Sequence, residues 1–221
     1  MIRRLILAGI IGLICVNGNT QTALKDTIVD CNYDFEFYQA WFKNYYSDSS
    51  DLNATQKKQV VQLIDSSIQL VNVVYYGYDK KIHKGQLLIN KWHSKSIKAI
   101  FDELLAIRFP IHSVKPICFF EFKDEVSMAA NNTSVFDYRP QVNSTKLSKH
   151  ATGSAIDINP IQNPYISSKT TTPAMARVNE PTGRIRVSDD PGKKAIAIFA
   201  KYGWTWGGNW KTLKDYMHFQ K

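Results

Sequence analysis

Two short stretches in the second half of the chain decide its fold and its chemistry. The first reads Ser148-Lys149-His150-Ala151-Thr152-Gly153-Ser154-Ala155-Ile156-Asp157, and the second reads Asp215-Tyr216-Met217-His218-Phe219. Together they supply two histidines and two well-placed acids, which can form a catalytic zinc site with three protein ligands and a fourth position for water. We assign His150, Asp157 and His218 as ligands, which leaves Asp215 as the general base.

The residues around the first stretch favour this assignment. Gly153 permits a tight backbone directly after His150. Residues 155–158 alternate like a strand, so that Asp157 points away from its apolar neighbours and toward the metal. A metal held in this way lowers the pKa of water to about 7 and polarises a carbonyl group.

These stretches also carry a resemblance to a known family. The pattern His-x-x-Gly-x-Ala-x-Asp followed by Asp-x-x-His resembles the zinc D-alanyl-D-alanine carboxypeptidases, which include VanX/VanY-type enzymes and the L-alanyl-D-glutamate endopeptidases of phage endolysins. The likeness begins near Ile82 and includes the motifs Asn163-Pro164-Tyr165 and Gly203-Trp204-Thr205-Trp206-Gly207-Gly208. The chain departs from the pattern at Gln220, where relatives usually have Glu, and this position lies outside the ligand set.

The resemblance implies an α+β fold with a small, mainly antiparallel sheet and packed helices, as in the hedgehog signalling domain. It implies that Arg139, in the motif Tyr-Arg-Pro, lies near the zinc and stabilises the transition-state oxyanion. Ser148 matches a family serine that binds substrate. From its position in the tryptophan-rich tail, Trp206 is interpreted either as a wall of the substrate cleft or as part of the core.

The implied reaction is hydrolysis of an amide bond in a peptidoglycan stem peptide. The Asp-x-x-His form favours the L-Ala–D-Glu bond. The alternative is removal of the terminal D-Ala, which requires a cation such as Arg184 or Arg186 for the free carboxylate. A hedgehog-like, zinc-bearing binding module is a further alternative, and the presence of Asp215 and Arg139 argues against it.

The composition agrees with one folded domain that has an anionic partner. The chain has 221 residues, of which 44% are hydrophobic and 12% aromatic, and these values exclude a disordered protein. Its net charge of +9 suits a carboxylate-bearing polymer such as peptidoglycan, or is simply a solvated basic surface. No nucleic-acid recognition motif is present, and we expect a monomer.

The N-terminus predicts export. Residues 1–18 read as a signal peptide, with Arg3 and Arg4 before an apolar run that is short for a membrane span. We therefore expect a periplasmic or extracellular protein, with lipidation at Cys15 or a retained anchor as alternatives. In an exported chain Cys31 and Cys118 either form a disulfide or remain as buried thiols.

Residues 19–70 are predicted to form an N-terminal helical segment, either a cover over the domain or an appended module, and residues 71–221 the catalytic domain. Aromatic and aliphatic spacing predicts helices over 34–46 and 55–70. The apolar run 114–122 predicts a buried central strand. Residues 161–188 predict a long loop at the rim of the site. Of the three other histidines, His83 is interpreted as a structural loop residue, with contact to substrate as the alternative. His93 is interpreted as a surface residue and His112 as a connector residue.

Overall fold

The computed structural model describes residues 33–141 and 144–221. Residues 31–221 form one compact unit. The predicted signal peptide, Cys15 and Cys31 lie outside the described residues, so export, lipidation and the pairing of Cys31 stay predictions; Cys118 is buried. In the described ranges, no helix combines the length and the apolar character that a bilayer span requires.

The unit consists of helices and small sheets, which confirms the predicted α+β class. Its helices are α2 Phe35–Asp48, α3 Ala54–Ser66, α4 Ser94–Ala106, α5 Asp124–Ala129 and α6 Gly192–Lys201, with short turns η1 Lys91–His93, η2 Ile117–Phe120, η3 Lys149–Thr152 and η4 Gly207–Asn209. Its strands are β1 Ile68–Tyr76, β2 Ile82–Asn90, β3 Ser113–Val114, β4 Asn132–Thr133, β5 Ala155–Asp157, β6 Tyr165–Ile166, β7 Thr171–Thr172, β8 Thr205–Trp206, β9 Lys214–Asp215 and β10 His218–Gln220. The pairs β1–β2, β5–β10–β8 and β7–β6–β9 are antiparallel, and β3–β4 is parallel.

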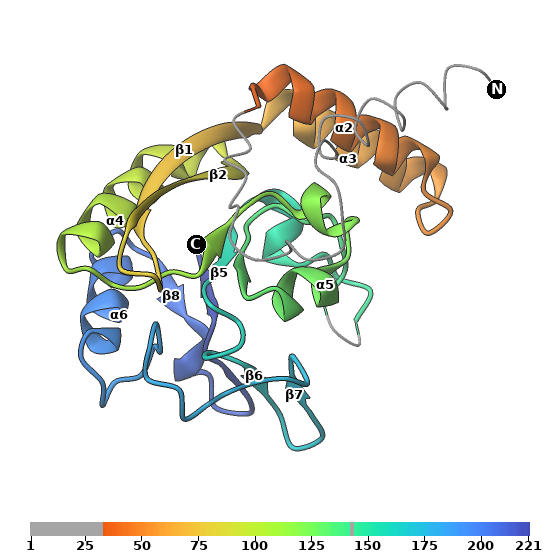
Figure 1. Ribbon diagram of the computed structural model, residues 1–221. Helices are drawn as coiled ribbons and strands as arrows, with labels where there is room; N and C mark the ends of the chain where they lie inside the picture. The colour runs from red at the N-terminus through yellow and green to blue at the C-terminus, as the bar shows by residue number, and fades with distance from the viewer. Residues whose placement is uncertain (1–32, 142–143) are drawn as a thin grey trace, which may run out of the picture. The chain divides into compact units, whose positions relative to one another are not determined.

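The long β1–β2 hairpin separates two apolar clusters. Leu87 and Ile89 belong to the cluster that also includes residues of α4, α6 and β10, whereas Leu88 belongs to the cluster under α2 and α3. Because successive strand residues face opposite sides, five consecutive β2 residues are buried. Figure 1 shows α4 along the hairpin and α6 beside α4.

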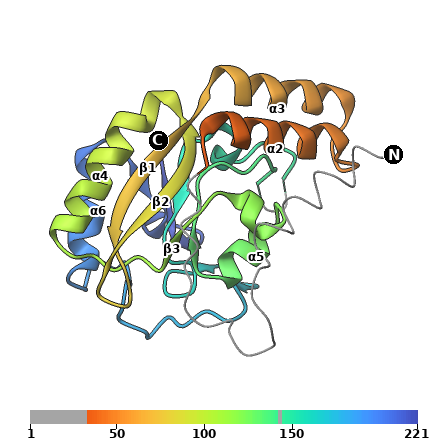
Figure 2. The same cartoon turned by 45° about the horizontal axis from the view of Figure 1, so that its top comes forward.

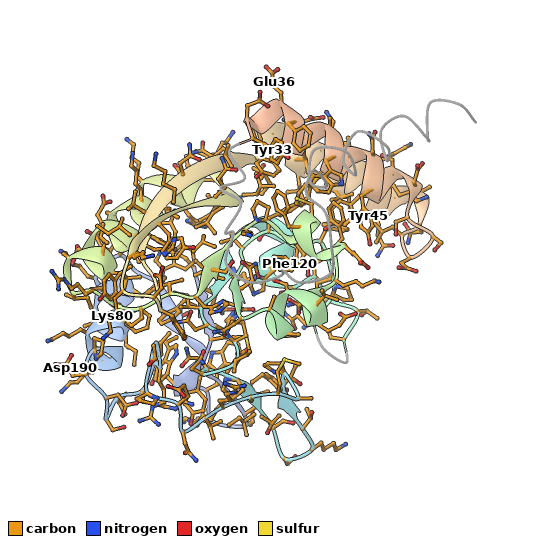
Figure 3. All side chains as sticks on the ribbon, in the orientation of Figure 1. Tyr33, Glu36, Tyr45, Lys80, Phe120 and Asp190 are labelled. Carbon is orange, nitrogen blue, oxygen red and sulfur yellow. The ribbon has the colours of Figure 1, made fainter. Side chains whose placement is uncertain are left out.

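The predicted N-terminal helices pack against each other and against the residues that lead into the site. Both begin with side-chain caps, in which Asp34 accepts from Phe37 N and Asn53 forms a capping box with Gln56. The antiparallel pair α2–α3 is seen most clearly in Figure 2. Figure 3 shows Glu36 on the outer side of α2, and Tyr33 and Tyr45 on the side toward Phe120.

The predicted central strand over 114–122 is wrong. The run is a strand only as far as Val114, passes through Pro116, and then forms the turn η2. Glu121 and Phe122 have positive φ values of 56° and 55°, which lie in the left-handed region and not in the extended region of a strand. An apolar run alone does not distinguish a buried strand from a buried helical turn, and here proline interrupts the strand.

Residues 161–188 contain more structure than the loop prediction implied. β6 pairs on one side with β7 and on the other with β9, which carries Asp215. The fully buried Asn163 links the two ends of this segment. Its Oδ1 accepts from Ile185 N at 2.6 Å and its Nδ2 donates to Gly183 O at 3.0 Å. The loop therefore forms part of the framework of the site.

The packing of α2 generates a test of whether the helical pair belongs to the cooperative unit. Phe42 is 1% exposed and its ring lies 5.7 Å from that of Phe136. Phe42→Ala should lower the free energy of unfolding by about 3–5 kcal/mol in one transition, as measured by denaturant unfolding. Trp92→Ala, at a position that is 80% exposed, should change it by less than about 0.5 kcal/mol. A separate early transition in Phe42→Ala would instead indicate an appended module.

Candidate metal centre

His150 is held by the turn η3. Ser148 caps this turn, and its Oγ accepts from His150 N at 3.2 Å. The ring Nδ1 lies 2.7 Å from Val135 O, a contact in which the nitrogen donates its proton. The side chain is buried, with Nε2 directed at His218 and Asp157.

Asp157 and His218 are brought together by strand pairing. β5 and β10 are antiparallel, and Asp157 is the direct partner of His218. Side chains of directly opposed residues lie on the same face of a sheet, with Cβ atoms about 5 Å apart. His218 Nδ1 consequently lies 3.0 Å from Asp157 Oδ1, although 61 residues separate them in the chain.

The donor groups of these three residues are spaced closely enough to share one metal ion, with Asp157 facing His150 through Oδ2 and His218 through Oδ1. His150 Nε2 is 3.2 Å from Asp157 Oδ2 and 3.3 Å from His218 Nδ1. An ion with ligand distances of about 2.0–2.1 Å in tetrahedral geometry separates its donors by roughly 3.3 Å. In the part of the chain that the structure describes, this is the one group of three or more histidine, cysteine or acidic residues close enough to share an ion.

Electrostatics at this centre favour a cation. Burial alone would raise the pKa of Asp157, but the charges and hydrogen bonds of His150 and His218 hold that pKa well below its usual range. Burial alone would lower the pKa of His218, but its hydrogen bond to Asp157 and the nearby carboxylates raise the pKa to about 9. A metal ion at this position would neutralise the same carboxylate.

Asp215 stands beside the centre without belonging to the donor group. Its Oδ1 is shielded from solvent and has no hydrogen-bond partner within the described residues. Burial, followed by repulsion from Asp157, raises the pKa of Asp215 to about 7. A carboxylate with such a pKa is suited to accept and return a proton near neutral pH.

Gly207 and Gly208, the glycines of the Trp-Gly-Gly motif, leave space for the strand that carries Asp215. A Cβ on Gly207 would lie 2.6 Å from Asp215 O and 2.9 Å from Asp215 Cβ, and a Cβ on Gly208 would overlap the Trp206 ring. Trp206 is 5% exposed and donates from Nε1 to Tyr216 O at 2.9 Å. The structure places Trp206 in the core, where it supports the segment 215–218.

Arg139 enters the site between two acids. Its Nη2 lies 2.7 Å from Asp124 Oδ2 and its Nε lies 2.8 Å from Asp137 Oδ2. Burial would lower the pKa of Arg139, but these carboxylates raise it. Burial and the charge of Asp124, offset by Arg139, raise the pKa of Asp137 to about 6. The guanidinium is therefore fixed in direction, as an oxyanion-binding group requires.

The three donor residues, Asp215 and Arg139 line one cavity of about 390 Å³. Of the residues predicted for the site, the structure brings six to the lining, and Trp206 is not among them. The described lining consists of Asp124, Met128, Arg139, Gln141, Ser148, Lys149, His150, Asp157, Tyr165, Thr170, Thr172, Trp210, Leu213, Asp215, Met217, His218 and Gln220. His83 lies elsewhere, where its Nε2 contacts Asp79 Oδ1 at 2.8 Å.

Three lining residues that were not assigned to the site from the sequence contact residues that were. Asp124 fixes Arg139 from helix α5, and nothing in the local sequence marks that contact. Trp210 lies with its ring centroid 5.4 Å from that of His218. Gln220 contacts His218 directly, Oε1 to Nε2 at 3.0 Å. The i, i+2 spacing on a strand, which puts two side chains on one face, was a signal for this last contact.

Residues 142–221 match a family model described as D-alanyl-D-alanine carboxypeptidase. The match supports the resemblance to the D-alanyl-D-alanine carboxypeptidases for this part of the chain. The match includes the three donor residues and Asp215 but not Arg139, and it is shorter than the likeness from Ile82 that the motifs suggested. No curated protein and no solved structure matches the chain.

The donor geometry predicts one tightly bound divalent ion per chain. His150→Ala or His218→Ala should abolish stoichiometric binding, because two remaining protein donors do not complete the site. Elemental analysis of purified protein and a competition titration with a chromogenic chelator measure this. His83→Ala removes a histidine outside the cavity and should retain the ion. Full metal content in either of the first two variants would contradict the assignment of ligands.

Proposed function

We propose that the chain is a zinc-dependent peptidase that hydrolyses an amide bond in peptidoglycan stem peptides. One observation carries the proposal: Asp215, whose buried Oδ1 has no hydrogen-bond partner among the described residues, stands beside a three-donor centre inside a cavity. The family match supports peptidase activity. The exclusively N and O donors suit zinc, and the Asp157 carboxylate makes the site hard enough to accept manganese or cobalt as well.

Each residue of this site has a separate role in the proposed reaction. His150, Asp157 and His218 would hold zinc, which when bound polarises a carbonyl and lowers the pKa of water to about 7. Asp215 accepts the proton of the attacking water as the new C–O bond forms. It then delivers that proton to the amine as the C–N bond breaks. Arg139 stabilises the negative charge that develops on the carbonyl oxygen.

The positions of the arginines favour the L-Ala–D-Glu bond over the terminal D-Ala–D-Ala bond. A carboxypeptidase needs a cation for the free carboxylate of its substrate. Arg184 is committed to Asp189, with Nε 2.5 Å from Oδ2, and Arg186 stacks 3.6 Å over the Tyr216 ring. Among the described residues neither arginine lines the cavity, and Arg139 is already assigned to the oxyanion.

The alternative is a D-alanyl-D-alanine carboxypeptidase. Two observations favour it: the description of the matching family, and Lys149, a cation in the cavity lining that could meet a free carboxylate. A non-catalytic, hedgehog-like binding module is the third possibility, and the presence of Asp215 next to the donor centre argues against it. The basic net charge and the expected export agree with a cell-wall substrate in the first two cases.

Removal of the proposed base should separate catalysis from metal binding. Asp215→Asn should keep the fold and one ion per chain but lower kcat by about 10²–10⁴-fold, because the base acts only on the transition state. Asp190→Asn, outside the cavity, should leave both quantities unchanged. Steady-state kinetics with metal analysis measures the two effects. Loss of the ion in Asp215→Asn would mean that Asp215 and Asp157 must exchange roles.

Digestion of purified muropeptides followed by mass spectrometry identifies the bond. We expect a product in which L-Ala alone remains on the sugar and the rest of the stem is released. Release of free D-Ala with an otherwise intact stem would establish the carboxypeptidase instead. If wild-type protein loaded with zinc leaves all muropeptides intact, the peptidase proposal is rejected in favour of the binding module.

A further inference from the structure

His218 uses both of its ring nitrogens. Nδ1 faces the donor centre, 3.0 Å from Asp157 Oδ1 and 3.3 Å from His150 Nε2. Nε2, on the opposite side of the ring, lies 3.0 Å from Gln220 Oε1. Because an amide oxygen only accepts hydrogen bonds, this contact places a proton on Nε2.

His150 shows the same arrangement with the two nitrogens exchanged. Its Nδ1 donates to the backbone oxygen of Val135 at 2.7 Å, and its Nε2 faces the centre. Outer hydrogen bonds of this kind fix the tautomer and the ring orientation of metal-binding histidines. For His150 the acceptor is backbone, whereas for His218 it is a side chain and so depends on the residue type at position 220.

Gln220 is held firmly enough to perform this task. It lies two residues after His218 on β10, so both side chains share one face of the strand. Between them, Phe219 is fully buried and stacks on Phe199 with ring centroids 3.9 Å apart. The backbone of Gln220 pairs with both neighbouring strands, and its oxygen accepts from Thr205 Oγ1 at 3.1 Å.

We propose that Gln220 is a positioning residue of the metal centre. Its amide oxygen keeps the proton of His218 on Nε2 and leaves the lone pair of Nδ1 directed at the position shared with His150 and Asp157. An amide does this without adding another negative charge to a cavity that already contains the carboxylates of Asp157 and Asp215. The inference rests on the metal site of the proposed function and concerns a residue outside the donor group.

A matched set of substitutions tests the proposal through metal affinity. Gln220→Met keeps the length of the side chain but removes the amide acceptor, and should raise the zinc dissociation constant by about 10–100-fold. Gln220→Glu restores an acceptor and should restore tight binding. Gln141→Met makes the same change elsewhere in the cavity lining and should leave the constant unchanged. Circular dichroism confirms that each variant is folded. If Gln220→Met does not fold, Gln220→Ala replaces it as the variant without the amide acceptor.

The tautomer supplies a second measurement that a purely structural role would not alter. In zinc-loaded wild-type protein with ¹⁵N-labelled histidine, NMR should show His218 with its proton on Nε2 and the metal on Nδ1. Folded Gln220→Met should lose the slowly exchanging Nε2 proton. Wild-type affinity in that variant, or a wild-type proton on Nδ1, would overturn the inference and leave the metal site intact. Failure of wild-type protein to bind zinc would overturn both.

Discussion

The pairing of β5 with β10 is the constraint on which the candidate site depends. It sets Asp157 directly opposite His218, and a slip of one residue would turn His218 to the other face of the sheet. The same slip would expose Phe219, which is fully buried against Phe199. The apolar core therefore stabilises the register that assembles the donors. The same strand pairing is needed for a stable fold and for the geometry of the site.

Charge is the second organising feature of this region. The carboxylates of Asp124, Asp137, Asp157 and Asp215 gather around the cavity, and Arg139 contacts two of them. Buried charges of one sign are costly unless they are neutralised, and the raised pKa values of Asp137 and Asp215 are one expression of that cost. A divalent ion at the donor centre would relieve the excess negative charge.

Segments far from the motifs supply the rigidity that the site needs. The 161–188 segment contributes β6 as a partner strand for the residues that carry Asp215. On the other side, the hydroxyl of Tyr46 on α2 accepts from Tyr138 N at 3.0 Å, next to Arg139. These contacts explain why an enclosed site can be built from strands of only two or three residues.

The sequence by itself determined the donor types and the order of the motifs, because residue chemistry and short spacing are local properties. His150, Asp157, His218 and Asp215 were all nominated on that basis. The α+β class followed from the family resemblance that those motifs carry. Only the tertiary structure decided that Trp206 packs in the core, that the 114–122 run leaves the strand after Val114, and that Asp124 contacts Arg139. The physical reason is that hydrogen-bond partners and covered faces are set by residues distant in the chain, which no local pattern specifies.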